Sequence, residues 1–145
     1  MKKIISIVLF LFVTSVSFSQ VITFELDTIQ LFKCPANLTP NESVVLNKFE
    51  YFDLKKIKSH VWAIDLKKKI FKVGEKIITI VRSESNLKEK WVYIEFLDPK
   101  GELHKLGIGT EKGTNKDIII VTKLDVDVNY QKGYFGYPIR LKVIN

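Results

Sequence analysis

The sequence has few of the residues on which most enzymes depend. Its 145 residues include one cysteine, Cys34, and two histidines, His60 and His104. We find no Gly-x-Ser-x-Gly, His-Glu-x-x-His, Cys-x-x-Cys, P-loop or Gly-x-Gly-x-x-Gly pattern. One cysteine excludes an intrachain disulfide, and nothing around Cys34 matches the setting of a cysteine nucleophile paired with a histidine. We therefore expect a chain that is not an enzyme, with no catalytic residue and no cofactor.

The cysteine and the histidines are expected to have ordinary structural roles. Cys34 ends an apolar run before Pro35, so we expect a buried small hydrophobe, with an intermolecular disulfide or a reactive thiol as the alternative. His60 begins one predicted strand and His104 follows a predicted turn. Both histidines are therefore expected at exposed strand ends.

Arginine is also scarce, although the chain is basic. The formal net charge is +7, but Arg82 and Arg140 are the only arginines. Nucleic-acid readers rely on the planar guanidinium of arginine, whereas scattered lysines usually form a solvated surface. We expect no nucleic-acid partner, and the charge favours at most a weak attraction to anionic glycans or lipid headgroups.

The N-terminal segment has the pattern of a secretion signal. Two lysines precede an apolar run over residues 4–13, and Ser17 and Ser19 place small residues before a cleavage site at Gln20. This leader resembles those of exported Bacteroidota proteins, which often end in a Ser-Gln junction. Residues 1–19 are therefore expected to be a signal peptide of a secreted or periplasmic protein with no membrane span after cleavage. The alternative is a leader retained as an anchor.

The clearest structural pattern is a β-hairpin. Val92, Ile94 and Phe96 fall on one face of an extended segment, because strand side chains alternate between two faces. Residues 98–101 read Asp-Pro-Lys-Gly, which supplies turn chemistry, and residues 103–108 form the return strand.

Similar patterns recur through residues 20–145 and predict one antiparallel all-β domain of about nine or ten strands. Residues 76–82, 91–97 and 117–124 are apolar on both faces, which slightly favours a closed or partly closed barrel over a two-sheet β-sandwich. The size and strand count resemble the small calycin barrels of the lipocalin and fatty-acid-binding type, without the Gly-x-Trp of lipocalins. The expected strands cover residues 21–33, 60–66, 70–73, 76–82, 91–97, 103–108, 117–124, 125–129 and 138–144.

Residues 40–57 are ambiguous. Thr39-Pro40-Asn41-Glu42 matches a helix capping box, yet the following residues are rich in β-branched and aromatic side chains. We expect a strand, with a helix as the alternative. Residues 83–89 and 130–137 are expected to be loops, the second because glycines interrupt its aromatic residues.

The chain offers two candidate ligand sites, of which the first is aromatic. Tyr130, Tyr134, Phe135 and Tyr137, together with Trp91, could line the rim of a binding pocket, or could be buried and close one end of the domain. The first hypothesis is an exported, non-catalytic binding protein for a small apolar or carbohydrate ligand. The alternative is an envelope or surface module that binds another protein through an exposed apolar patch or edge strand.

The second candidate is a row of oxygen ligands. As a strand, residues 125–129 would place Asp125, Asp127 and Asn129 on one face, where they could hold Ca²⁺. The same alternation is typical of any strand with one face in solvent. We therefore expect no metal site.

Overall fold

The computed structural model describes residues 20–35, 50–86, 88–111, 113–125 and 130–144. The predicted leader, the ambiguous residues 40–49 and the possible Ca²⁺ ligands Asp127 and Asn129 lie outside the described residues, as do the side chains of Cys34, Asp125 and Tyr130. The predictions made for these positions therefore stay predictions.

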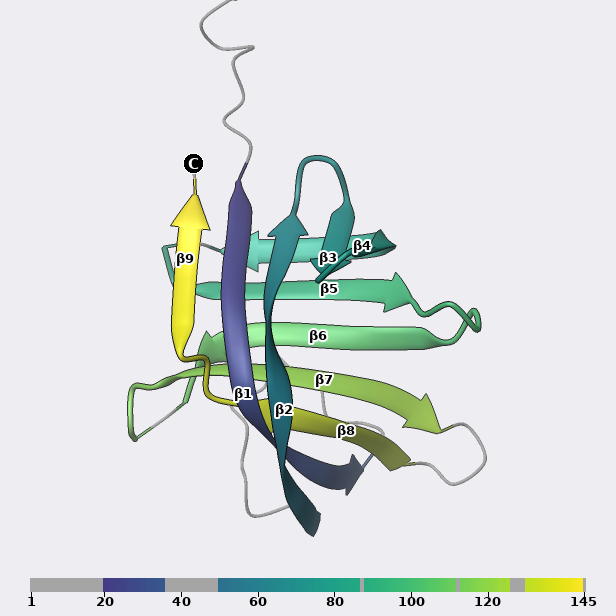
Figure 1. Cartoon of the computed structure of the whole chain (residues 1–145), viewed down its shortest axis with the longest axis vertical. Coiled ribbons are helices and arrows are strands. Elements are labelled where there is room, and N and C mark those ends of the chain that lie inside the picture. The colour runs from purple at the N-terminus through teal and green to yellow at the C-terminus, as the bar shows by residue number, and fades with distance from the viewer. Residues whose placement is uncertain (1–19, 36–49, 87, 112, 126–129, 145) are drawn as a thin grey trace, which may run out of the picture.

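The described residues form nine strands and contain no helix (Figure 1). Every pair of neighbouring strands is antiparallel. The strands are β1 (Val21–Pro35), β2 (Glu50–Asp65), β3 (Ile70–Val73), β4 (Lys76–Asn86), β5 (Trp91–Leu97), β6 (Leu103–Thr110), β7 (Asp117–Asp125), β8 (Tyr130–Gly136) and β9 (Arg140–Ile144).

Strands β1 to β8 close into a barrel. Each of them pairs with the next, and residues 30–35 of β1 pair with β8. Residues 21–25 of β1 pair with β9 instead, so β9 adds a ninth strand beside the barrel. Figure 1 shows β9 and the first half of β1 running across the direction of β5, β6 and β7. The predicted all-β barrel is confirmed, and eight closed strands with one addition are consistent with a calycin-like barrel.

Large apolar side chains fill the barrel interior. Phe24, Ile64 and Leu106 expose 1% of their surface or less. A side chain that faced a water-sized cavity would expose more of its surface, because water could reach it. Trp62 packs between Phe24 and Phe71, with ring centroids 5.3 and 5.8 Å away. Eight strands enclose a space that side chains alone can fill, and in the described part of this barrel they do so.

A smaller group of buried side chains lies on the outer face of the barrel. Ile119 and Val121 point into the core, so Ile118 and Ile120 point outward, yet both are buried. Phe32 and Phe135 complete this outer group, and their rings lie 6.0 Å apart. This outer packing explains why the sequence of β7 is apolar on both faces.

The predicted hairpin is confirmed as β5 and β6. Val92, Ile94 and Phe96 all point into the core. In the turn, the Oδ1 atom of Asp98 accepts hydrogen bonds from the backbone N–H groups of Lys100 and Glu102, each at 2.9 Å. Gly101 has a φ of 79°, the left-handed conformation that glycine adopts without strain. Turn chemistry and alternation thus placed these two strands correctly.

The prediction of a loop over residues 130–137 was wrong, because most of this segment is β8. Gly133 had been interpreted as a loop residue. In the structure a Cβ atom on Gly133 would lie 2.0 Å from the carbonyl oxygen of Val121, so the glycine lets β7 and β8 pair closely. Glycine here marks a close approach of two strands and not a turn.

Three further boundaries differ from the predictions. The predicted strand at residues 60–66 is the end of β2, which begins at Glu50, so residues 50–57 are strand and His60 lies within it. Strand β4 continues through Asn86 into the predicted loop. Strand β9 begins at Arg140, two residues after the predicted start, and among the described strands it pairs with β1 alone.

Candidate functional site

The structure separates most of the predicted aromatic rim. Tyr134 packs against the interior core, where its ring meets that of Trp62 edge-on at 6.4 Å, and burial raises its pKa. Phe135, the next residue of the same strand, faces outward and is buried in the outer group. Trp91 is half-buried at the start of β5 and donates a hydrogen bond from Nε1 to Glu89. Alternation along the strands therefore places these rings on different faces.

An outer aromatic cluster does form from Tyr51, Phe135 and Tyr137. The ring centroids of Tyr51 and Tyr137 lie 6.0 and 6.1 Å from that of Phe135, both edge-on, and both tyrosines are exposed. Burial and then a hydrogen bond to Glu111 raise the pKa of Tyr137 to about 12. Two of the predicted rim residues, Phe135 and Tyr137, thus meet on the outside of the barrel. Sequence reasoning missed Tyr51, which comes from the beginning of β2.

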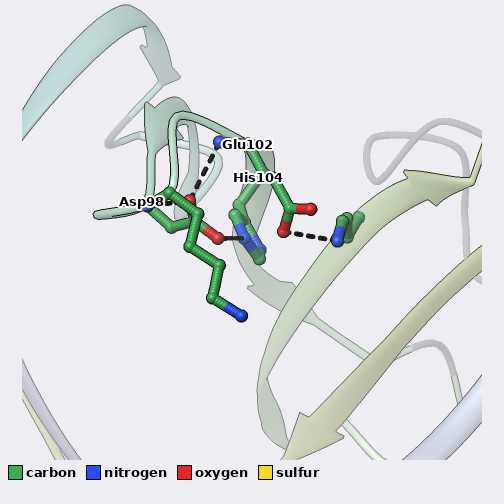
Figure 2. A network of polar contacts seen from close by, with 5 residues as sticks. Asp98, Glu102 and His104 are labelled. Atoms are coloured by element: carbon green, nitrogen blue, oxygen red, sulfur yellow. Dashed lines mark hydrogen bonds and ion pairs between the residues drawn. The ribbon is translucent and has the colours of Figure 1, made fainter.

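A group of polar side chains, separate from the aromatic cluster, lies at the β5–β6 turn, where Asp98, Glu102 and His104 meet (Figure 2). The Nε2 atom of His104 lies 2.9 Å from the Oδ2 atom of Asp98, and the imidazole stacks on Phe96. Glu102 forms an ion pair with Lys123 of β7. The pairing register of the hairpin explains why the imidazole stacks on Phe96, because it places His104 directly opposite that residue.

This turn group has the residue types of a metal site. One ligand atom from each of Asp98, Glu102 and His104 can be chosen so that all three lie within 4.8 Å of one another. The three side chains are already engaged, however. Both oxygens of Asp98 accept hydrogen bonds, His104 is bonded to Asp98, and Glu102 is paired with Lys123. These contacts stabilise the β5–β6 turn and connect it to β7. We call Asp98, Glu102, His104 and Lys123 the turn lock.

The turn lock is expected to make stability depend on pH below pH 5. The hydrogen bond from His104, followed by that from the backbone N–H of Glu102, holds the pKa of Asp98 at about 2, below its ordinary 3.8. A carboxyl group whose pKa is lowered by folding stabilises the fold above its unfolded pKa and loses that effect as the pH falls through the folded value. The melting temperature of Asp98→Asn should therefore lie below that of the wild type at pH 5, and the gap should narrow as the pH falls from about 4 to about 2.

Thermal unfolding followed by circular dichroism measures this gap. Asp117→Asn is the matched control, because Asp117 is exposed and its side chain forms no ion pair with another described residue. Its melting temperature should follow that of the wild type at every pH. A gap for Asp98→Asn that stays constant from pH 5 to pH 2 would contradict the lock.

The most unusual feature of the described strands is the free edge of β2. Strand β3 pairs only with Trp62 to Asp65. Within residues 50–60, Glu50, Tyr51, residues 54–56 and His60 pair with β1 across two register shifts, and none of residues 50–60 pairs with another described strand. This segment is more than half of the 16-residue strand, and its start is drawn at the bottom of the barrel in Figure 1. Phe52 and Leu54 within it are 55% and 69% exposed. We call residues 50–60 the β2 edge.

Comparisons with family models, curated proteins and solved structures found no match to this chain. None of the described residues belongs to a helix that is long and apolar enough to cross a membrane. The interpretation of the β2 edge and of the aromatic cluster therefore rests on the geometry described above.

The second half of the β2 edge is basic. Lys55, Lys56 and Lys58 are exposed, and the described residues provide none of them with an ion pair or hydrogen bond. Unlike the side chains at the β5–β6 turn, these lysines and the second side of residues 50–60 have no partner among the described residues. A row of open backbone N–H and C=O groups beside exposed apolar side chains can accept another strand.

Proposed function

We propose that this chain is a non-catalytic interaction module that binds an extended segment of another protein. The partner segment adds to the β2 edge as a further antiparallel or parallel strand. The observation that carries the proposal is that residues 50–60 pair only with β1 among the described strands. If the leader acts as the sequence predicts, this surface meets proteins of the cell envelope or the exterior.

The length and surroundings of the β2 edge support strand addition. An average strand has about 5–6 residues, so residues 50–60 offer more than a full strand of open backbone. Exposed apolar side chains at Phe52 and Leu54 can pack on alternate side chains of an added segment. Tyr51, in the aromatic cluster, extends this apolar surface. Strand β9 also has a side without a described neighbour but is only five residues long.

The filled interior supports this proposal over a ligand held inside the barrel. Phe24 and Phe71 each expose 1% of their surface, and Ile94 exposes none. The Nε1 atom of Trp62 has no hydrogen-bond partner among the described residues and exposes less than 1 Å². A ligand group could bond to that N–H only by displacing a packed side chain, which costs more free energy than the bond returns.

Hydrogen exchange in the presence of a strand-forming probe tests the proposal. The probe is a soluble ten-residue peptide that alternates threonine and valine, which is neutral and favours extended structure. We expect amides of residues 50–60 that exchange quickly in the free protein to become protected when the peptide is added. Amides of β9 should not change.

Two matched variants locate the binding surface. Leu54→Asp places a charge on the β2 edge and should abolish the added protection, whereas Ile144→Asp makes the same change at an exposed site on β9 and should leave it intact. Protection that appears at β9, or nowhere, would overturn the proposal.

A further inference from the structure

We infer that the partner segment is acidic. This inference rests on the function proposed above and concerns the chemistry of the strand that the β2 edge accepts. Residues 54–60 contain three lysines and no acidic residue. A strand laid along this stretch would bring its own side chains within reach of Lys55, Lys56 and Lys58.

Three lysines lie within four residues of the β2 edge, whereas other strand lysines without an ion pair among the described residues, such as Lys72, Lys105 and Lys142, lie singly on their strands. Arg82 of β4 pairs with Glu84, and Arg140 of β9 pairs with Glu25 at 3.6 Å. The positive charge of those residues is therefore balanced within the barrel. Among the described residues, Lys55, Lys56 and Lys58 have no such partner. Their positive charge is left for a partner to balance.

A second copy of this chain is an alternative occupant whose fit depends on register. Two β2 edges paired antiparallel about Lys56 would bring lysines close to lysines, which destabilises a strand pair, whereas pairing about Leu54 would bring Asp53 opposite Lys55. A chain that forms a dimer in analytical ultracentrifugation, with no affinity for the glutamate peptide, would therefore overturn the inference. The geometry favours a peptide strand over an anionic membrane or nucleic acid, because the open groups of the β2 edge are backbone N–H and C=O groups.

The order of apolar and basic residues along β2 predicts the order of residue types in the partner segment. Phe52 and Leu54 precede the lysine stretch, so the acidic part of the partner segment lies opposite residues 55–58 and an apolar part lies opposite residues 52–54. Lys55 and Lys56 are consecutive and pair with Ile29 and Thr28, so they point to opposite faces of the sheet, and an acidic residue on either face of an added strand can meet one of them.

Fluorescence anisotropy with the purified chain and three labelled ten-residue peptides tests the inference. The peptides alternate valine with glutamate, threonine or lysine. We expect the glutamate peptide to bind roughly tenfold more tightly than the threonine peptide at low salt, with the difference lost near 1 M salt, as for exposed ion pairs. The triple variant Lys55→Glu, Lys56→Glu, Lys58→Glu should instead prefer the lysine peptide.

Three controls separate the possible outcomes. Lys142→Glu on β9 should bind all three peptides like the wild type. A glutamate peptide with every backbone amide N-methylated should bind much more weakly, because it cannot donate backbone hydrogen bonds; equal binding would show attraction by charge alone and overturn the inference. Tight binding of heparin or of vesicles containing anionic lipid, without binding of the glutamate peptide, would also overturn it.

The results distinguish this inference from the proposed function. Equal affinity for the glutamate and threonine peptides would contradict an acidic partner and leave strand addition intact. Failure of all three peptides to bind would contradict strand addition itself.

Discussion

Replacement of Phe24 by alanine is expected to lower the free energy of unfolding by about 3–5 kcal/mol, the usual loss for a buried phenylalanine. Phe24 is 1% exposed, and its ring lies 5.3 Å from that of Trp62 in the centre of the barrel. The surrounding strands are paired on both sides, so they cannot collapse into the space that the ring leaves. Urea denaturation followed by tryptophan fluorescence and by circular dichroism measures the change.

Phe52→Ala is the matched control for this experiment. The same side chain is removed from the neighbouring strand β2, but there it is 55% exposed. We expect a change of about 0.5 kcal/mol or less. A loss below about 1 kcal/mol for Phe24→Ala would contradict a filled interior, because the truncation of a side chain that already faces a cavity removes few contacts.

Gly133→Ala is expected to destabilise the barrel by about 3 kcal/mol or more, at or beyond the upper end of the usual cost of overpacking. The added Cβ would lie 2.0 Å from the carbonyl oxygen of Val121 and 3.0 Å from the Cα of Thr122. Both atoms belong to the backbone of β7, so β7 and β8 would have to separate. Strand β8 also pairs with β1, and the separation would therefore strain the closure of the barrel.

The control for this glycine lies on β6. A Cβ on Gly109 would meet no atom within 4 Å, so we expect Gly109→Ala to unfold at nearly the same urea concentration as the wild type. Failure of Gly133→Ala to fold at all, beside a well-folded Gly109→Ala, would be the stronger form of the same result. Equal stability of the two variants would contradict the close pairing of β7 and β8.

Local patterns were sufficient to predict the strands whose neighbours are close in sequence. The β5–β6 hairpin follows from alternation around Phe96 and from the turn residues Asp98 and Gly101, and all of this information lies within a few residues. The same reasoning failed at Gly133. A glycine needed at a turn and a glycine needed for close approach look the same in a sequence, and the second requirement comes from Val121 on another strand.

The candidate site depends on pairings that are distant in sequence, and for this reason little of it could be predicted. The predicted rim combined Tyr134 with Phe135, but consecutive residues of a strand point to opposite faces once the segment is extended. The aromatic cluster needs Tyr51 from β2 beside Phe135 from β8, because both strands pair with β1. Among the described strands the β2 edge has no second neighbour, because β3 is only four residues long, and no local pattern states where a neighbouring strand stops.

Strand addition requires residues 50–60 of β2 to have one side free for a partner, and hydrogen exchange of the free protein measures this directly. In β6, which is paired on both sides, we expect consecutive amides to exchange slowly. In residues 50–60 of β2, amides bonded to β1 should exchange slowly and those on the open side should exchange quickly. Slow exchange at every amide of residues 50–60 would contradict the account, because it would mean that the edge is already occupied.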